Sequence, residues 1–335
     1  MPRGHSSSAE LSGLDSGIPL IGQETSFVGV LRKLARVAPS DIPVLLTGET
    51  GTGKDVCARA LHHLSERRAR PFVPVDCGAL PRTLFEREMF GHTRGAFTDA
   101  YREQRGLVAM ADGGSLLLDE VDTLSMEAQS ALLRVLEDGT YRPLGAERFS
   151  TVNVRIISAS NVDLDRVVGE GRFRADLFFR LAGVRLRLPA LRERRQDVRL
   201  LSEHFLRMHQ RQKDEVWEFS GEAIRRLESY AWPGNVRELS NVIRNAIMFS
   251  ADGRIEADDL DLPVPVERDL PPTLRAARAQ LVGRFERRYL DDLLRRCQGN
   301  LTRASREAGQ DRRALGRLVK KHALDPRAYH AIPGR

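Results

Sequence analysis

The chain has 335 residues, 41% of them hydrophobic and 30% charged, a composition typical of a packed globular protein with two or three domains. It contains no run of about 18 apolar residues that could cross a membrane and no secretory signal, and its three cysteines have neither metal-ligand spacing nor a disulfide pattern, so a reduced, cytoplasmic protein fits best. The net charge of +7 is uneven: residues 281–335 hold 14 Lys and Arg against 6 Asp and Glu, which favours a polyanion-binding module over a merely solvated surface.

Apolar patterning divides the chain into an α/β part and helical parts. Residues 1–19 are predicted to be a flexible tail. Over residues 20–188, short apolar runs alternate with helical patterns, which predicts a parallel sheet covered by helices. The runs suit strands buried on both faces and lie at 44–46, 72–75, 115–118 and 152–159. Residues 189–262 are predicted to be a helical region and residues 263–272 a proline-rich linker. Residues 273–335 are predicted to form a long helix followed by two short ones.

A glycine-rich segment follows the first predicted strand and precedes a helix predicted over residues 56–64. This is the context of a phosphate-binding (Walker A) loop, in which backbone N–H groups turn toward phosphate oxygens and a lysine reaches the outer phosphates. The alternative is a glycine-rich turn, which chance seldom combines with both flanking elements. Asp55 stands where a hydroxyl that binds Mg²⁺ is usual, and it could hold the ion through a water. The candidate nucleotide-binding residues are Gly48, Glu49, Thr50, Gly51, Thr52, Gly53, Lys54 and Asp55.

Two further strand ends carry polar side chains suited to hydrolysis of a nucleoside triphosphate. Asp119 and Glu120 follow the run 115–118. After a phosphate-binding loop, this pattern predicts that Asp119 holds Mg²⁺ and that Glu120 polarises the attacking water. Asn161 follows the last run and is placed to sense the terminal phosphate, although a lone Asn at a strand end is more often a turn residue.

The segment 88–100, Glu-Met-Phe-Gly-His-Thr-Arg-Gly-Ala-Phe-Thr-Asp-Ala, is a loop of small residues that displays one aromatic side chain, Phe97. It resembles the sigma-54-contacting loop of bacterial enhancer-binding proteins, the AAA+ activators of sigma-54 RNA polymerase, and the resemblance runs over about residues 20–324. Phe97 could instead fold into a core, but such loops often carry function. Asp99 replaces a family glycine, which removes backbone freedom and adds negative charge. The implied contact residues are Gly95, Ala96, Phe97, Thr98, Asp99 and Ala100.

The resemblance also implies arginines that act on the nucleotide. Arg174 and Arg180 lie in a segment that resembles the family's arginine finger, so they are implied to project into a neighbouring subunit's site. The alternative for any single arginine is a surface ion pair. Arg237 lies in a segment that resembles the second sensor, in which an arginine touches phosphate from the lid.

Two further positions follow from the resemblance. Ile21 and Gly22 lie in a segment similar to the one beside the adenine in the family. Asp76 stands where many relatives have an Asn that restrains the catalytic glutamate. It is therefore implied to be a switch residue that repels Glu120 or shares a proton with it.

Residues 281–324 resemble the Fis-type helix-turn-helix that ends such activators. Asp311 is a good N-cap for its predicted recognition helix, whereas Gly316 inside that helix costs about 1 kcal/mol relative to Ala. Gln310 stands where relatives bury an aliphatic residue. An apolar stripe suits pairing with a second copy or packing within the module: Leu281, Phe285, Tyr289, Leu293 and Leu294. The candidate DNA-binding residues are Arg312, Arg313, Arg317, Lys320 and Lys321.

The resemblance as a whole implies an AAA+ ring ATPase, hexameric or heptameric, that uses ATP and Mg²⁺. It would bind enhancer DNA through dimeric modules and remodel the closed complex of sigma-54 RNA polymerase. Two rivals stay open: a DNA-binding regulator of this fold that does not act through sigma-54, and a general AAA+ remodeller of other proteins. Because about twenty residues precede the ATPase region, no N-terminal regulatory domain is expected, and control by a trans-acting partner is favoured.

Overall fold

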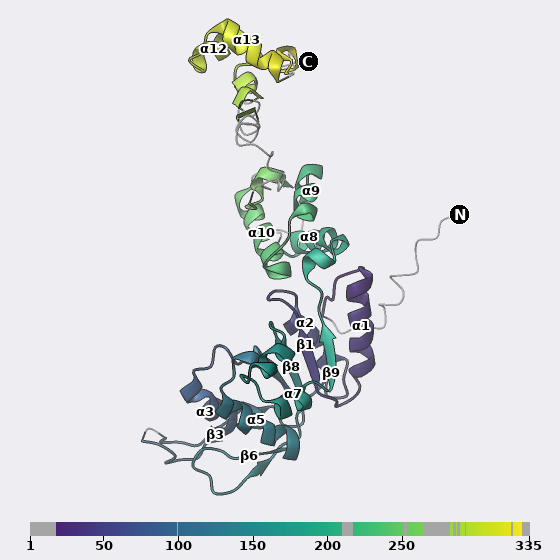
Figure 1. Ribbon diagram of the computed structural model, residues 1–335, viewed down its shortest axis with the longest axis vertical. Helices are drawn as coiled ribbons and strands as arrows, with labels where there is room; N and C mark the ends of the chain where they lie inside the picture. Colours follow the sequence, from purple (N-terminus) through teal and green to yellow (C-terminus); the bar gives the residue numbers. More distant parts are fainter. Residues whose placement is uncertain are drawn as a thin grey trace, which may run out of the picture. The chain divides into compact units, whose positions relative to one another are not determined.

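The computed structural model describes residues 18–329, except 99, 210–216, 251–252, 264–281, 284–285, 287–288, 292 and 323. It divides into two compact units, Met1–Leu262 and Pro263–Arg335 (Figure 1). Most of the predicted tail and linker therefore lies outside the described residues, as do Leu281 and Phe285 of the predicted stripe. In the part of the chain that is described, no helix is both long and apolar enough to cross a membrane.

In its described residues, the first unit is built on a five-stranded parallel sheet in the order β2–β5–β8–β1–β9. The strands are β1 (Val44–Thr47), β2 (Phe72–Asp76), β5 (Ser115–Asp119), β8 (Arg155–Ser160) and β9 (Val184–Arg187). This confirms the predicted α/β fold. The run predicted at 152–159 begins as a strand only at Arg155, because the N–H of Val152 donates to the carbonyl of Gly139 and that of Asn153 to the side chain of Asp112. Parallel pairing gathers the carboxyl ends of the strands at one edge, where ligands bind in such sheets.

Helices cover both faces of the sheet, because successive residues of each strand point to opposite sides. Leu45 belongs to one hydrophobic cluster, whereas Val44 and Leu46 belong to another. The first cluster contains side chains of α3 (Phe85–Phe90), α4 (Leu107–Met110), α5 (Met126–Asp138), α6 (Leu164–Gly169) and α7 (Ala175–Leu181). The second contains side chains of α1 (Thr25–Val37) and α2 (Lys54–His63).

Two antiparallel hairpins lie beside α3 and α5 (Figure 1). They are formed by β3 (Gly91–His92) with β4 (Gln104–Arg105), and by β6 (Thr140–Tyr141) with β7 (Ser150–Thr151). A β-bridge between His92 and Leu144 joins the two hairpins. The loops at 93–103 and 142–149 therefore lie side by side.

A helical lid completes the first unit. It contains α8 (Gln196–His209), α9 (Gly221–Ser229) and α10 (Asn235–Phe249), with β10 (Glu218–Phe219) paired to β11 (Arg254–Ile255). Trp232 is fully buried in the lid core and donates its indole N–H to the carbonyl of Leu227 at 2.8 Å. Single turns of 3₁₀ helix lie at η1 (Arg82–Leu84), η2 (Val121–Thr123), η3 (Leu191–Glu193), η4 (Ala257–Asp259) and, in the second unit, η5 (Pro326–Tyr329).

The second unit contains α12 (Leu301–Glu307) and α13 (Arg312–Lys321). Asp311 caps α13 by accepting the backbone N–H of Arg313 at 2.8 Å. Leu293 and Leu294 are fully buried and pack with Leu315 of α13. At these two positions the stripe therefore forms the module's own core rather than a face for a second copy, whereas Tyr289 is 40% exposed.

Replacing Gly316 with Ala is expected to stabilise the second unit. Gly316 lies inside α13, and a Cβ atom there would have nothing within 4 Å, so the helix gains about 1 kcal/mol without a clash. Calorimetry of the full chain should show a higher unfolding temperature for one transition. Gly309→Ala is the matched control: its surroundings are equally open, but its φ of 61° makes the same change destabilising. Equal gains at both positions would contradict the helix-propensity argument.

Candidate nucleotide site

The glycine-rich loop between β1 and α2 turns sharply on glycines with positive φ. The angle is 79° at Gly51 and 99° at Gly53, which directly precedes α2. A Cβ atom on Gly51 would lie 2.3 Å from the carbonyl oxygen of Gly234 in the lid, so a larger residue requires the lid to move. The helix begins at Lys54, earlier than predicted, and its amino end adds partial positive charge that favours an anion.

Lys54 is held against the phosphate-binding loop. Its side chain is 8% exposed, and Nζ donates hydrogen bonds to the carbonyls of Gly48 at 2.7 Å and Glu49 at 3.1 Å. Burial lowers the pKa of Lys54, whereas the charges of Asp119 and Glu120 act in the opposite direction. The charge of Lys54 is therefore placed to act on the carboxylates at the end of β5, two strands away from β1 in the sheet.

Glu120 follows β5 in a left-handed backbone conformation, with φ of 53°. Its N–H donates to Asp119 Oδ1 at 3.0 Å, and its carbonyl accepts the N–H of Thr123 at 3.0 Å and the hydroxyl of Thr123 at 2.7 Å. These bonds hold a conformation that non-glycine residues seldom adopt, and such conformations cluster at functional sites.

Asp76 lies opposite Asp119 in the pairing of β2 with β5. Its Oδ1 accepts the N–H groups of Gly78 at 3.0 Å and Ala79 at 3.1 Å, so its carboxylate is held by backbone amides. A Cβ atom on Gly78 would lie 2.4 Å from Glu120 Oε2, which places the glutamate directly over this turn. Burial raises the pKa of Glu120, and the charge of Asp76 raises it further. The predicted influence of Asp76 on Glu120 therefore has an electrostatic basis here.

The two predicted sensors approach the loop from different elements. Asn161 follows β8 and lines a cavity of about 500 Å³ together with Thr47, Gly48 and Glu49. Arg237 lies in the first turn of α10 with an exposed side chain, and its backbone N–H donates to the carbonyl of Gly51 at 3.3 Å. Both stand beside the phosphate-binding loop, and their contact with phosphate stays a prediction.

An apolar cavity of about 290 Å³ lies on the other side of the loop, and Ile21 lines it. Gly22, the next residue, admits close neighbours: a Cβ atom there would lie 2.4 Å from the ring of Phe27 and 2.7 Å from Asp197 Oδ2. The size and the apolar lining suit a flat heterocycle such as adenine. The lining also includes Leu20, Phe27, Val56, Leu201, Phe205 and Val236, together with the charged side chains Asp55, Arg59 and Arg194.

Three buried residues around these cavities were missed by the sequence reasoning. Arg194, 2% exposed, donates to the carbonyl of Thr52 at 3.1 Å and stacks over the ring of Phe27 at 4.3 Å. Asp197, fully buried, accepts the backbone N–H of Gln23 at 2.7 Å. In the run Arg-Glu-Arg-Arg-Gln-Asp such charges look solvent-exposed, so no signal marked them. Asn235, the third, lies two residues before Arg237, in the segment that resembles the second sensor, where only Arg237 was given a role.

The predicted Mg²⁺ ligands Asp119 and Asp55 lie in different surroundings. Asp119 ends β5 beside Lys54, whereas Asp55 lines the apolar cavity. Among the described residues, no three His, Cys, Asp or Glu side chains gather as a metal site. The carboxylate of Asp119 fits the oxygen preference of Mg²⁺ in a site completed by phosphate and water. A direct role for Asp55 has no such support.

The predicted arginine fingers both form ion pairs within their own chain. Arg174 Nη2 lies 2.7 Å from Asp176 and its Nη1 donates to Ser130 at 3.1 Å, while Arg180 lies 3.6 Å from Glu137. The side chains are 37% and 56% exposed. The structure does not bring either arginine to Lys54 of its own chain, so a role toward another subunit stays a prediction.

The predicted sigma-54 loop closes on itself between β3 and β4. The N–H of Gly95 donates to the carbonyl of Ala100 at 2.8 Å, and Ala100 is buried. Phe97 is 37% exposed, because its ring packs against His92 at 4.9 Å and lies below the guanidinium of Arg87 at 5.8 Å. Thr98 is exposed, and Asp99 lies outside the described residues. Phe97 is therefore partly covered rather than fully displayed.

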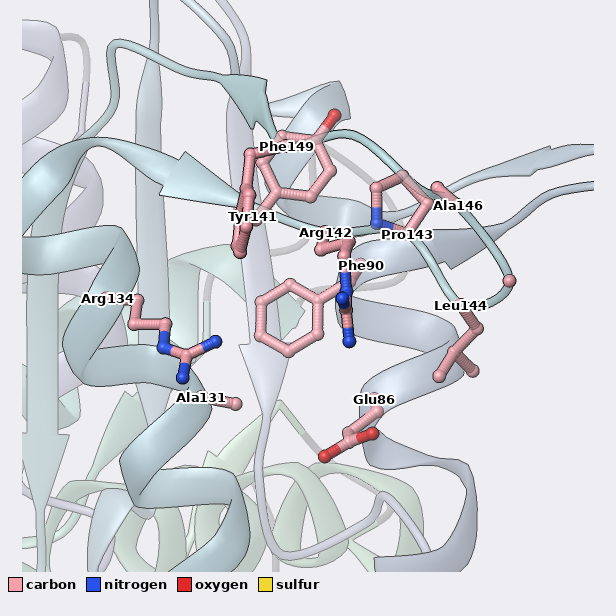
Figure 2. A pocket seen from close by; sticks show the side chains of 11 residues that line it. Glu86, Phe90, Ala131, Arg134, Tyr141, Arg142, Pro143, Leu144, Ala146 and Phe149 are labelled. Carbon is pink, nitrogen blue, oxygen red and sulfur yellow. The ribbon is translucent and has the colours of Figure 1, made fainter.

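A cavity of about 360 Å³ lies beside the loop of the β6–β7 hairpin, residues 142–149 (Figure 2). Phe149, 53% exposed, and Arg142 come from the hairpin, whereas Arg134 reaches the cavity from α5. This loop also touches the predicted sigma-54 loop, because the N–H of Thr93 donates to the carbonyl of Leu144 at 3.0 Å.

Comparison with known proteins agrees with this geometry. A family model described as the sigma-54 interaction domain matches residues 20–187, and one described as an AAA+ ATPase lid domain matches residues 192–277. The transcriptional regulatory protein GlrR of Escherichia coli K12 is 43% identical over 88% of this chain and 66% of its own length. The regulatory protein AtoC of the same strain is 38% identical over 92% of this chain and 68% of its own length. The chain thus spans about two thirds of the length of these relatives.

Solved structures show the same relationship. NtrX from Brucella abortus in complex with ATP is 31% identical, with a TM-score of 0.68, over 95% of this chain and 72% of that one. The ADP complex of yeast Hsp104, 19% identical with a TM-score of 0.50, shows the shared fold alone. Because the sigma-54 model covers half of the residues and the lid model follows it directly, the chain belongs to the sigma-54 interaction domain family of AAA+ proteins.

Proposed function

We propose that the chain hydrolyses ATP and uses that reaction to activate transcription by sigma-54 RNA polymerase. The observation that carries the proposal is the meeting of Lys54, Asp119 and Glu120 at the carboxyl edge of the sheet, beside a lid that contacts the phosphate-binding loop. The ATP complex of a relative supports ATP as the nucleotide, and the family description supports sigma-54 as the target.

ATP would lie along the loop with its base in the apolar cavity. Ile21 and Gly22 border the base, and the backbone N–H groups of residues 48–54 cradle the phosphates. Lys54 meets the outer phosphates after exchanging its carbonyl partners for phosphate oxygens. Asn161 and Arg237 contact the terminal phosphate from β8 and from the lid.

Glu120 acts as the general base of hydrolysis. It accepts a proton from water as the water oxygen attacks the terminal phosphorus, and the bond to the bridging oxygen breaks to give ADP and phosphate. Asp119 would hold Mg²⁺, which when bound neutralises charge on the phosphate oxygens.

Arg174 and Arg180 complete the site of a neighbouring copy in a ring. To do so they leave Asp176 and Glu137, which is feasible because exposed ion pairs are worth little. Their planar guanidinium groups then stabilise charge on the transferring phosphoryl group.

The catalytic end of the sheet connects directly to the sigma-54 loop. From Asp76 the chain runs through α3 to the hairpin that carries Phe97 and Thr98. A change at the phosphates therefore reaches the loop through a short segment, and movement of the loop remodels the closed promoter complex.

DNA binding is assigned to the second unit. In this proposal residues 20–188 and 189–262 form the ATPase and its lid, 263–272 the linker, and 273–335 the DNA-binding domain. Lys321 forms an ion pair with Glu286 at 2.8 Å and would exchange it for phosphate. The residues that face enhancer DNA are Arg312, Arg313, Arg317 and Lys320, all exposed on α13.

Lys54→Ala is expected to reduce ATP turnover by about 100-fold or more, because the phosphates lose their only lysine at the loop. Phosphate release measures this, and open-complex formation with sigma-54 holoenzyme on a supercoiled template should fail in parallel. Lys33→Ala, which removes an exposed lysine from α1, is the control. Unchanged turnover in the Lys54 variant, together with no open complexes from the parent, would contradict the proposal.

Asp76→Asn is expected to shift the acid limb of the pH profile of turnover to lower pH. Glu120 works deprotonated, and its pKa is raised by burial and by the charges of Asp76, Asp119 and Asp122, while Lys54 lowers it. Turnover therefore falls as pH drops through the raised pKa of Glu120. Removing the carboxylate of Asp76 lowers that pKa, so turnover persists to lower pH. Asp138→Asn, at the exposed end of α5, should leave the profile in place. An unmoved limb in the Asp76 variant contradicts this coupling.

Mixing inactive variants tests whether the arginines act on a neighbour. Arg174→Ala and Lys54→Ala should each be inactive alone, yet equal mixing leaves about one quarter of the interfaces with both groups intact. Partial recovery of ATP turnover is expected. Arg172→Ala, which removes another exposed arginine that pairs with Glu170, should be active alone. Absence of recovery at any mixing ratio would place Arg174 outside the site.

A further inference from the structure

Asn235 occupies an unusual position at the junction of lid and loop. It is the first residue of α10, is fully buried, and has φ of 53°. Asn tolerates this left-handed conformation better than most residues, and Gly tolerates it at least as well. The backbone alone therefore does not explain why a buried amide stands here.

The side-chain amide of Asn235 joins the lid to the phosphate-binding loop. Its Oδ1 accepts the N–H of Leu191 at 2.7 Å, where the chain enters the lid. Its Nδ2 donates to the carbonyl of Thr50 at 3.0 Å and to Glu49 Oε2 at 3.2 Å. Both donor hydrogens thus have acceptors in the loop, and the acceptor oxygen is used within the lid.

The contact with Thr50 determines how one peptide group of the loop is turned. The carbonyl of Thr50 and the N–H of Gly51 belong to the same planar trans peptide and point in opposite directions. By holding the carbonyl, Asn235 directs the N–H of Gly51 away from the lid. If this peptide rotated, a carbonyl oxygen would replace an N–H group in the face that an anion must meet.

Glu49 strengthens the same junction from the loop side. Its carboxylate accepts two hydrogen bonds from Arg192 of the lid, at 2.5 Å and 2.6 Å. The hydrogen bond from Arg192 lowers the pKa of Glu49 to about 2, and Asn235 contributes in the same direction. Glu49 is thus charged at neutral pH. Because the ion pair with Arg192 is exposed, the buried amide is the more consequential partner.

We propose that Asn235 is a positioning residue for the triphosphate: it fixes the Thr50–Gly51 peptide and Glu49, and so links phosphate binding to the position of the lid. This rests on the proposed binding of ATP. Asn235 does not touch the reacting atoms and acts through the loop. It holds the loop before and after the phosphates arrive, so its loss weakens ground-state binding more than the chemical step.

Asn235→Asp tests the proposal with little change of shape. The new carboxylate still accepts the N–H of Leu191, but it places an acceptor against the carbonyl of Thr50 and the carboxylate of Glu49. Affinity for a slowly hydrolysed ATP analogue, measured by calorimetry, is expected to fall about tenfold or more, and KM for ATP should rise with a smaller change in kcat. Asn241→Asp, the same change at an exposed position of α10, should match the parent.

A second change separates this role from general stability. In Asn235→Asp with Glu49→Gln, the new amide at position 49 can donate to the new carboxylate at position 235. The two facing acceptors at the carbonyl of Thr50 remain, so only part of the lost affinity should return. Glu49→Gln alone gives the reference affinity against which the double variant is compared. If Asn235→Asp does not fold, Asn235→Gly keeps the backbone conformation, removes the amide, and should also weaken binding.

Two results would overturn the inference: parental affinity in the Asn235 variants, or an affinity loss that Glu49→Gln does not restore while the unfolding temperature falls. Lys54→Ala distinguishes this from failure of the proposed function. If Lys54→Ala abolishes turnover while Asn235→Asp behaves as the parent, only the role of Asn235 is wrong. If Lys54→Ala leaves turnover and analogue affinity unchanged, the ATP site itself is wrong.

Discussion

The carbonyl of Gly51 accepts the N–H of Val236 at 2.9 Å and the N–H of Arg237 at 3.3 Å, and the rest of the nucleotide site depends on this contact. The first N–H groups of any helix have no acceptor within the helix. At the amino end of α10, the phosphate-binding loop supplies the acceptor for two of them. Only glycine permits it, because the carbonyl of Gly234 fills the space of a side chain at position 51. The loop and the lid are thereby parts of one site.

Two buried charged residues, Arg194 and Asp197, also hold this junction between loop and lid. Arg194 and Asp197 are almost completely removed from water, which is costly unless their hydrogen bonds are made within the protein. They bond to the carbonyl of Thr52 and to the N–H groups of Gln23 and Glu24, whereas Arg194 Nε and Asp197 Oδ2 have no hydrogen-bond partner among the described residues. The segment beside the apolar cavity, the lid and the phosphate-binding loop therefore meet at one ion pair. A nucleotide that contacts all three would stabilise their present arrangement, and loss of its terminal phosphate would weaken it.

The sequence predicted the parts of this site that have local signatures. The strand-loop-helix pattern around Lys54 and the acidic end of the run 115–118 carry their chemistry in adjacent residues, and the alternation of apolar runs predicted the parallel sheet that brings them together. It could not predict Arg194 or Asp197, because burial of a charge depends on partners far away in the chain. Residue 197 bonds to residue 23, and no local pattern records that distance.

Other differences have the same origin. Phe97 is partly covered because its ring packs against His92 and lies below the guanidinium of Arg87, which a loop of small residues does not reveal. The sequence pattern of Leu293 and Leu294 fits either a core of the module or a face that pairs with a second copy. Their packing against Leu315 of α13 decides for the core. Asp55 follows Lys54 directly, yet the helix turns its side chain toward the apolar cavity rather than toward Asp119. Helical geometry separates neighbours in sequence by about 100°.

Hydrogen exchange of the full chain, with and without a slowly hydrolysed ATP analogue, tests the central claim most directly. If loop and lid form one nucleotide site, the analogue protects backbone amides of residues 48–55, 20–24 and 234–238 together, over the same concentration range. Protection confined to residues 48–55, with the lid amides at 234–238 unchanged at saturation, would contradict the account.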